Sequence, residues 1–316
     1  MLALVFDGEP RVKDVPEPEV REGEALVRVL LAGVCGTDLE LLAGYKNFRG
    51  IPGHEMVGVV ETAPDRAWVG VRVVAEINIA CGACALCEEG LGNHCERRQV
   101  LGISGKPGAF AERVAIPLRN LHRVPDPLAD EEAVWVEPLA AALGVWEEGV
   151  RKGDRVLVVG DGRLGALIAL GLQTRGASVE LAGKHREKTA FLRSLGIPIA
   201  QGAPRPRYPW VIEATGSTRG LEAARKWARP RGTVVLKSTT HEHSRVDVSQ
   251  LVVNELRVVG SRCGPFGPAL DALARRSLPV RQLVSKTYPL SRALEALEAS
   301  GRPGVFKVLL DPRMLY

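Results

Sequence analysis

The sequence predicts an α/β protein in which a β-rich domain is joined to a doubly wound parallel sheet. Residues 1–115 contain short apolar runs separated by Gly, Pro and charged residues, which is typical of many short strands. From Arg155 onward, strand-like and helix-like segments alternate, as they do in βαβ units. The chain has 316 residues, 46% of them hydrophobic, which is enough for two ordinary domains.

In the β-rich part, three apolar runs predict strands at Ala25–Ala32, Met56–Val60 and Val71–Val74. Many short strands of this kind favour a barrel-like or irregular β domain. The composition then changes, and Leu128–Val150 is rich in Ala and Leu. We expect a helical region there, with Asp130 as its N-cap.

In the second part, apolar periodicity predicts two strand–helix pairs in succession, Arg155–Val159 with Leu164–Thr174 and Val179–Leu181 with Arg186–Leu195. The remaining expected elements are strands at Val211–Glu213, Thr233–Leu236, Leu256–Val259 and Val305–Leu310, and helices at Leu221–Ala228, Ala269–Ala274 and Ser291–Ala299.

Composition and charge exclude several function classes. The net charge is +5, and no basic run with interleaved aromatic residues points to nucleic acid. The longest apolar runs, such as Ala166–Leu172, are much shorter than a bilayer span, so we expect no membrane partner. The first residues, Met1–Asp7, lack the basic region of a secretion signal, and we therefore expect a cytoplasmic protein.

A glycine-rich turn follows the first predicted strand of the parallel sheet. Its sequence is Gly160-Asp161-Gly162-Arg163-Leu164-Gly165, and an apolar helix comes next. In this pattern the first glycine permits a tight turn, the second lets the backbone approach a pyrophosphate, and the third lets strand and helix pack closely. The sequence therefore predicts a dinucleotide site, and an unrelated glycine-rich turn is the alternative.

The residues after the second strand bear on the choice of cofactor. A free ribose 2′-hydroxyl is usually bound by an acid about 20 residues beyond the fingerprint. This chain has Gly183, Lys184, His185 and Arg186 there, and Glu180 lies inside the strand. A small residue followed by basic ones suits a 2′-phosphate, so we expect NADP to be preferred over NAD. A basic surface loop is the alternative interpretation.

Four of the six cysteines, Cys81, Cys84, Cys87 and Cys95, fall within fifteen residues. In a reducing compartment such a cluster indicates a metal site rather than disulfides. Four thiolates on one short loop suit a structural zinc ion with no open coordination position. An iron–sulfur cluster is the alternative, but the bacterial ferredoxin pattern needs a shorter last spacing and a following Pro.

A second set of candidate metal ligands is dispersed along the chain. Cys35 lies in Gly33-Val34-Cys35-Gly36-Thr37-Asp38, His54 lies in Gly53-His54-Glu55, and Glu137 begins Glu137-Pro138-Leu139. One thiolate, one imidazole and one carboxylate leave a fourth position open, as in catalytic zinc sites. Spacing alone does not prove this, because a single Cys or His is more often a core residue.

These motifs, in this order and over nearly the whole chain, resemble the zinc-dependent alcohol dehydrogenases of the medium-chain dehydrogenase/reductase superfamily. The resemblance implies a GroES-like catalytic domain at 1–138 and 266–316 with a Rossmann domain at 139–265 between them. It implies a homodimer or homotetramer joined through the Rossmann domains. It also implies two zinc ions per chain.

The resemblance assigns roles to residues of the second set. Cys35, His54 and Glu137 are implied to bind catalytic zinc. Glu55 is implied either to lie just outside the ligands or to be an alternative ligand that exchanges with water. Asp38 is expected to orient His54, since a metal-bound His usually has an acceptor behind it.

Further roles follow from the same resemblance. Thr37 is implied to take the alcohol proton, and Lys307 to contact the cofactor pyrophosphate. Glu40 stands where the family often has His as the outer proton relay, and this resembles the archaeal-type glucose and aldose dehydrogenases. Only thirteen residues separate Gly196 from Trp210, so we expect the Rossmann sheet to lack an element or to have a shortened helix on its adenine side.

We therefore expect a zinc-dependent oxidoreductase that transfers a hydride between a small alcohol and NADP. A sugar or polyol dehydrogenase is the alternative within the same class. A non-catalytic, zinc-stabilised NADP(H)-binding protein is the alternative from another class, although the complete set of Cys35, His54 and Glu137 argues against it.

Overall fold

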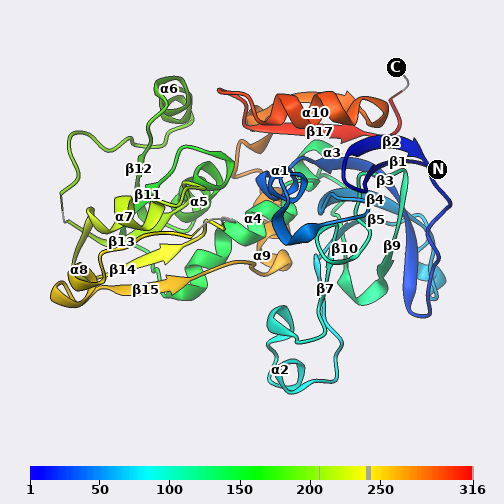
Figure 1. Cartoon of the computed structure of the whole chain (residues 1–316), viewed down its shortest axis with the longest axis horizontal. Helices are drawn as coiled ribbons and strands as arrows, with labels where there is room; N and C mark the ends of the chain where they lie inside the picture. The colour runs from blue at the N-terminus through cyan, green and yellow to red at the C-terminus, as the bar shows by residue number, and fades with distance from the viewer. Residues whose placement is uncertain (206, 240–242, 315–316) are drawn as a thin grey trace. The chain divides into compact units, whose positions relative to one another are not determined.

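The computed structural model describes residues 1–205, 207–239 and 243–314. Their backbone divides into two compact units. The first comprises Met1–Glu137, Leu270–Arg275 and Val280–Tyr316, and the second comprises Pro138–Ala269 and Arg276–Pro279 (Figure 1). The N-terminal and C-terminal segments therefore fold together, and most of the second unit lies between them in the sequence.

A seven-stranded sheet organises the first unit. Its order is β10-β5-β4-β3-β17-β16, and β9 also pairs with β3. The long strand β3 (Glu24–Gly33) pairs antiparallel with β4 (Glu55–Thr62) and with β17 (Lys307–Asp311), so the C-terminal strand completes the N-terminal sheet. The other strands are β5 (Arg72–Ala75), β9 (Arg113–Pro117), β10 (Leu121–Arg123) and β16 (Val284–Pro289). The three predicted apolar runs lie in or overlap β3, β4 and β5.

Smaller elements complete the first unit. Two further small sheets are the hairpin of β1 (Leu2–Phe6) with β2 (Pro10–Asp14), and β6 (Asn78–Ile79) with β7 (Gln99–Leu101) and β8 (Gly105–Lys106). The helices that lie wholly or partly in this unit are α1 (Gly36–Leu42), α2 (Ala85–Glu88), α3 (Asp130–Ala133), α4 (Val136–Leu143), α9 (Phe266–Ala274) and α10 (Ala293–Ser300).

The predicted N-cap of the first Ala-rich region is wrong by one residue. Helix α3 begins at Asp130 itself, and Ala129 is the cap residue. The Glu132 carboxylate accepts a hydrogen bond from the Ala129 N–H at 3.1 Å, which satisfies that donor in place of a capping side chain. Asp130 instead accepts a hydrogen bond from Arg72 Nη1 at 2.9 Å.

A five-stranded parallel sheet organises the second unit, in the order β12-β11-β13-β14-β15. The strand order reverses between β11 and β13, which is the switch point where doubly wound sheets bind ligands. The strands are β11 (Arg155–Val159), β12 (Ser178–Ala182), β13 (Tyr208–Glu213), β14 (Ala228–Leu236) and β15 (Arg257–Gly260). The helices that lie wholly in this unit are α5 (Arg163–Thr174), α6 (Arg186–Ser194), α7 (Gly220–Arg225) and α8 (Val248–Val253).

The predicted helix Leu221–Ala228 is too long at its C-terminal end. Helix α7 ends at Arg225, and Ala228 begins β14, where it pairs with Tyr208. Trp227 and Ala228 are both buried against Tyr208 in one hydrophobic cluster. Packing of the aromatic rings therefore outweighs the helical preference of this Ala-rich segment.

The short segment before β13 shortens the sheet, as its length predicts. Among the described residues between α6 and β13 there is no named strand, only an isolated parallel bridge between Leu181 and Ile199. The Leu181 N–H donates to Pro198 O at 2.8 Å, and the Ala200 N–H donates to Leu181 O at 2.9 Å. The sheet thus keeps a trace of a sixth strand beside β12, at the outer position of the usual doubly wound order.

Candidate functional site

The pairing of β3 with its neighbours brings three distant segments to one point in the first unit. Gly33, at the end of β3, is opposite Glu55 on β4 and Leu309 on β17. Cys35 lies two residues after the end of β3, and His54 directly precedes β4. The ligand atoms of Cys35, His54 and Glu55 all lie within 4.8 Å of one another. One thiol, one imidazole and one carboxylate in this space can hold a zinc ion.

Asp38 fixes the two loops that carry these groups. Its side chain is fully buried, and its carboxylate accepts hydrogen bonds from the Cys35 N–H at 2.8 Å and the Gly53 N–H at 3.3 Å. His54 Nδ1 lies 3.3 Å from Asp38 Oδ1, an ion-pair distance without the alignment of a hydrogen bond. The Asp38 carboxylate faces Nδ1, which leaves the opposite ring nitrogen, Nε2, as the candidate metal ligand.

The charges around His54 favour its protonated form in the metal-free protein. Burial by itself would lower the pKa of His54, but Asp38 and Cys35 outweigh burial and raise this pKa well above its usual value. A metal ion must displace that proton to bind the ring, so metal binding here is coupled to proton release.

Glu55 is paired with a cation from the last strand. Its carboxylate forms an ion pair with the Lys307 ammonium, and each side chain is 1% exposed. Lys307 Nζ also lies 5.0 Å from the centroid of the buried Trp135 ring, which suits a cation–π contact. The expected contact of Lys307 with a pyrophosphate would require it to share or leave Glu55, so that role stays a prediction.

Glu137 lies near these groups without joining them. It does not belong to the set, within the described residues, whose ligand atoms lie inside 4.8 Å. Its pKa is raised to about 7, chiefly by burial and also by the charges of Glu55 and Asp38, while His54 and Lys307 oppose the rise. The structure therefore assembles Cys35, His54 and Glu55, with Glu137 close enough to be affected electrostatically.

The predicted proton-relay residues lie on α1 next to this group. Thr37 Oγ1 is 3.7 Å from Cys35 Sγ. Glu40 is three residues further along the same helix, which places it on the same face, and it is partly exposed. A hydroxyl beside the candidate metal and a carboxylate toward solvent are consistent with a relay, but neither role is tested by these contacts.

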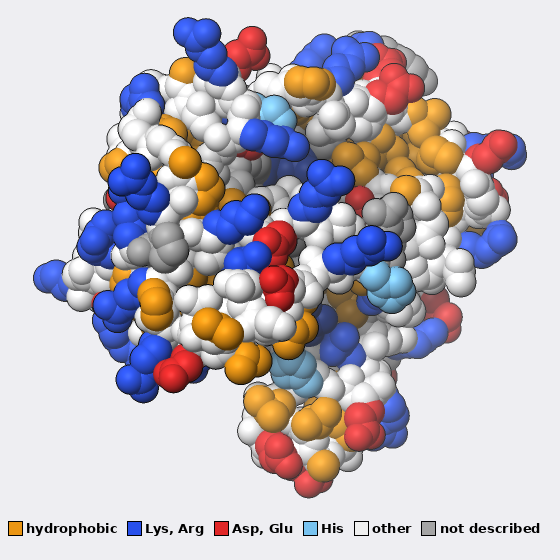
Figure 2. All heavy atoms as spheres, turned by 60° about the vertical axis from the view of Figure 1, so that its left-hand side comes forward, with side chains coloured by type: hydrophobic (Ala, Val, Ile, Leu, Met, Phe, Trp, Pro, Cys, Tyr) orange, Lys and Arg blue, Asp and Glu red, His pale blue; other side chains and the backbone are white. Residues whose placement is uncertain are grey.

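The four cysteines of the 81–95 loop form the second group. Their sulfur atoms all lie within 4.8 Å of one another, with Sγ–Sγ distances of 3.5 Å for Cys84–Cys87, 3.8 Å for Cys84–Cys95 and 3.9 Å for Cys81–Cys87. Tetrahedral zinc with bonds of about 2.3 Å separates its sulfur ligands by about 3.8 Å. The loop is therefore shaped for zinc. Figure 1 shows it projecting below β7, and Figure 2 shows the lobe that it forms.

Electrostatics within the loop favour thiolates unevenly. The pKa of Cys81 is lowered to about 6, first by the Ala83 N–H, which donates to its sulfur, and further by Cys95 and Arg97. The pKa of Cys87 is raised to about 11 by burial and by the neighbouring thiols. A divalent cation would lower the energy of all four thiolates together, which these hydrogen bonds alone do not achieve.

The glycine fingerprint of the second unit has the expected geometry. Gly160 has φ of +133°, and a Cβ there would lie 2.3 Å from Ala214 O. A Cβ on Gly165 would lie 2.1 Å from Gly160 O, so this glycine allows α5 to approach β11. A Cβ on Gly162 would meet no atom within 4 Å, which leaves open space at the start of α5. This helix N-terminus can receive a pyrophosphate. Arg163 and Leu164 form the first turn of α5.

The basic segment after β12 lies where the sequence places it, between β12 and the first turn of α6. Gly183, Lys184 and His185 form the connection, and Arg186 begins α6. Glu180 is engaged elsewhere, 3.6 Å from Arg207. One contact here is not predicted by the sequence pattern: the carboxylate of the fingerprint residue Asp161 accepts a hydrogen bond from the His185 N–H. The signal available was an acid at the second position of the fingerprint.

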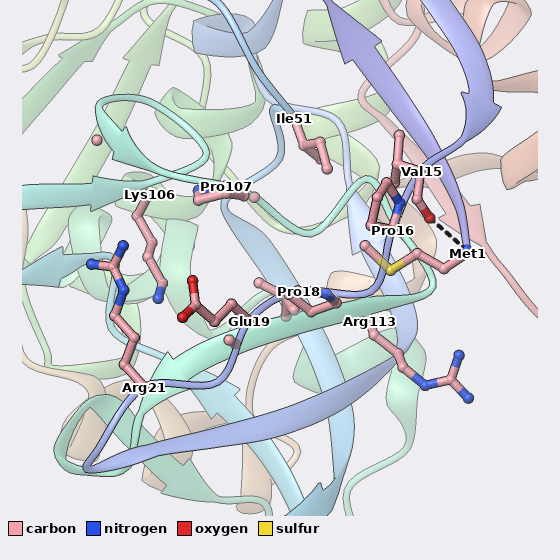
Figure 3. A pocket seen from close by; sticks show the side chains of 14 residues that line it. Met1, Val15, Pro16, Pro18, Glu19, Arg21, Ile51, Lys106, Pro107 and Arg113 are labelled. Carbon is pink, nitrogen blue, oxygen red and sulfur yellow. Dashed lines mark hydrogen bonds between the residues drawn. The ribbon is translucent and has the colours of Figure 1, made fainter.

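A pocket of about 270 Å³ lies in the first unit (Figure 3). Met1, Pro16 and Pro18 line one side of it, and Lys106 and Arg21 line the other. None of its described lining residues belongs to either candidate metal group. We therefore assign the candidate site to the cysteine–histidine–glutamate group and not to this pocket.

Comparison with known proteins links the site to a family. The Alcohol dehydrogenase GroES-like domain matches residues 21–126. The chain is 32% identical to D-altritol 5-dehydrogenase of Agrobacterium fabrum, with 93% of each chain covered. It is 36% identical to L-threonine 3-dehydrogenase of Streptomyces avermitilis, with 98% of this chain and 99% of the relative covered.

Solved structures agree with these relatives. A zinc-binding dehydrogenase of Sinorhizobium meliloti bound to NADP superposes with a TM-score of 0.88 at 28% identity, covering 98% of this chain and 99% of the other. An Escherichia coli alcohol dehydrogenase complexed with NADH superposes with a TM-score of 0.90 at 26% identity and the same coverage.

No helix formed by the described residues is long and apolar enough to cross a membrane.

We expect Cys84→Ser to lose about one zinc ion per chain and to lower the thermal midpoint, because a structural zinc contributes directly to folding. Metal analysis of the purified protein and a thermal melt measure the two effects. Cys263→Ser is the matched control, since Cys263 belongs to neither group, and it should keep the wild-type zinc content. Full zinc retention by Cys84→Ser would contradict the assignment.

Proposed function

The chain belongs to the zinc-type alcohol dehydrogenases of the medium-chain dehydrogenase/reductase superfamily, and from this premise we propose that it oxidises a small polyhydroxylated alcohol with NADP⁺. The broader activity, a zinc-dependent and NAD(P)-dependent dehydrogenase of alcohols or polyols, follows from the family. The observation that carries the proposal is the convergence of partly buried Cys35 with buried His54 and Glu55 near the end of β3.

The residues of the site fit a zinc ion. Cys35 and His54, with a carboxylate from Glu55 or Glu137, would hold it, and Asp38 would keep the His54 ring oriented. A zinc ion bound there supplies Lewis acidity, which lowers the pKa of an alcohol toward neutrality. Asp38, His54 and Glu55 are all buried, so their side chains are shielded from bulk water.

Proton removal is the task that we propose for α1. Thr37 can accept the alcohol proton at Oγ1 and pass its own proton outward, since a hydroxyl is both donor and acceptor. Glu40, on the same helix face and partly exposed, is the proposed acceptor on the solvent side. Residues 160–165 would hold the pyrophosphate of a nicotinamide cofactor, which when bound would supply the acceptor for the hydride.

The substrate class is supported by two observations. A neighbouring relative is a D-altritol 5-dehydrogenase, and another, from Bombyx mori, is a sorbitol dehydrogenase that is 25% identical. Glu40, which stands where the family often has His, resembles the archaeal-type glucose and aldose dehydrogenases. We therefore place polyols and related sugars ahead of simple monohydric alcohols.

The wild-type enzyme is expected to reduce NADP⁺ with at least one pentitol, hexitol or aldose of a panel that also contains simple alcohols. Absorbance of the reduced cofactor measures it. Turnover of simple alcohols alone would overturn the substrate class. Tight dinucleotide binding without turnover of any member would instead favour the non-catalytic binding protein.

Replacement of Cys35 by Ser should reduce kcat/KM by roughly 10³ or more, because Lewis-acid stabilisation is worth several kcal/mol. Zinc content should also fall by about one ion per chain while circular dichroism stays unchanged. A folded Cys35→Ser protein with wild-type activity would contradict the role of Cys35.

The preference for NADP is proposed from the segment after β12. Lys184 and Arg186 offer donors to a 2′-phosphate, and residues 183–186 contain no acid. A 2′-phosphate carries more negative charge than a hydroxyl, so these cations should bind it more tightly.

Arg186→Ala should lower the ratio of kcat/KM for NADP⁺ to that for NAD⁺ by about tenfold, since a charge-assisted hydrogen bond is lost. Steady-state kinetics with both cofactors measure the ratio. Arg193→Ala, an exposed change on the last turn of the same helix, is the control and should not move it. An unchanged ratio in Arg186→Ala would contradict the proposal.

We further propose that two copies associate through β15 and α8. β15 is an edge strand of the five-stranded sheet. Val248, Val252 and Val253 on α8 are 60%, 71% and 76% exposed, which is unusual for a helix that faces water. An edge strand beside an apolar helix can pair with its own copy about a two-fold axis.

Val252→Asp should therefore lower the mass in solution toward that of a single chain, because it puts a charge into the apolar contact. Light scattering after size exclusion measures the mass. Leu294→Asp, at an exposed leucine of α10 in the first unit, is the control. A wild-type protein that is already a single chain would contradict this interface.

A further inference from the structure

The side chain of Asp161, a residue of the glycine fingerprint, contacts His185 in the loop after β12. Asp161 Oδ2 accepts a hydrogen bond from the His185 N–H at 2.7 Å, and Oδ1 lies 2.9 Å from His185 Nδ1. The Asp161 residue is 6% exposed, whereas the His185 side chain is 48% exposed. A buried carboxylate from the first turn of the dinucleotide fold is thus fixed against the residues expected to choose the cofactor.

The carboxylate of Asp161 occupies the space that a side chain at position 183 would need. A Cβ on Gly183 would lie 2.6 Å from both Cβ and Oδ2 of Asp161, and 2.6 Å from Thr189 Cγ2. These distances are too short for any side chain at 183 while Asp161 is in place. An acidic side chain at position 183, directly after β12, and the carboxylate of Asp161 therefore cannot both be present. This chain has glycine at 183 and the carboxylate at 161.

The basic residues after β12 and the carboxylate of Asp161 are expected to shift the preference between NADP and NAD in opposite directions. Lys184 and Arg186 attract a 2′-phosphate, whereas a carboxylate beside the same loop repels it and can accept a hydrogen bond from a 2′-hydroxyl. His185 moderates the repulsion, because its N–H and ring nitrogen already engage both carboxylate oxygens.

We infer that Asp161 is a specificity-determining residue for the cofactor, and that its carboxylate limits the preference for a 2′-phosphate conferred by Lys184 and Arg186. The inference rests on the dinucleotide site of the proposed function. It does not depend on which cofactor the wild-type enzyme prefers, since it concerns the direction in which Asp161 moves the ratio.

Asp161→Asn tests the inference, because Asn keeps the size of the side chain and an oxygen for the His185 N–H but removes the charge. We expect the ratio of kcat/KM for NADP⁺ to that for NAD⁺ to rise about tenfold, through loss of a like-charge repulsion. The ratio of the dissociation constants of NADH and NADPH, from fluorescence titration without substrate, should rise by the same factor.

His185→Ala should move both ratios the opposite way, about threefold, because the Asp161 carboxylate then keeps its charge without the ring that offsets it. When His185→Ala is combined with Asp161→Asn, it should lower neither ratio relative to Asp161→Asn alone. This variant retains the backbone N–H of residue 185, so it also serves if Asp161→Asn fails to fold.

Asp154→Asn is the matched control. It removes one carboxylate charge at the other end of β11, where Asp154 Oδ2 accepts a hydrogen bond from the Arg151 N–H at 2.9 Å, and it should leave both ratios unchanged. The inference would be overturned if folded Asp161→Asn gave ratios within twofold of the wild type. It would also be overturned if His185→Ala lowered the ratios equally in the presence and in the absence of the Asp161 charge. An unresponsive Arg186→Ala with a responsive Asp161→Asn would instead remove only the proposed NADP preference.

Discussion

The candidate site depends on the register of β3 against β4 and β17. Gly33 is paired with Glu55 on one side and with Leu309 on the other. This pairing brings together Cys35, Glu55 and Lys307, which are far apart in the sequence. Gly33 is required at the crossing, since a Cβ there would lie 2.3 Å from Glu55 Oε2 and 3.3 Å from Lys307 Nζ. The strand register therefore brings the candidate ligands together, and Asp38 holds the two loops that carry Cys35 and His54.

The same register buries more charge than an ordinary core contains. Asp38, His54, Glu55 and Lys307 are each 3% exposed or less. Removing ionised groups from water costs several kcal/mol per ion, so such groups persist only when paired or bound to a cation. The ion pair of Glu55 with Lys307 satisfies part of this requirement. The pKa of Glu137 is raised to about 7 chiefly because burial disfavours its ionised form, which is the same cost acting on a carboxyl without a paired cation of its own.

Local patterns predicted the second unit better than the contacts across the first. Arg155–Val159 matches β11 at both ends, because a continuous apolar run between polar residues defines a buried strand. Asp130 and Ala228 were misassigned where a neighbouring carboxylate and aromatic packing outweighed local preference. The Lys307–Glu55 pair could not be predicted from local pattern, since 252 residues separate its members. The contact of Asp161 with His185 depends on how close two turns lie, which the sequence alone does not specify.

Anomalous scattering from a crystal, measured on both sides of the zinc absorption edge, tests the two-site arrangement most directly. We expect two zinc peaks per chain, one among the sulfur atoms of Cys81, Cys84, Cys87 and Cys95 and one beside Cys35 Sγ and the His54 ring. A single peak at the four cysteines, in protein purified with zinc present, would contradict the claim that the β3 register builds a metal centre.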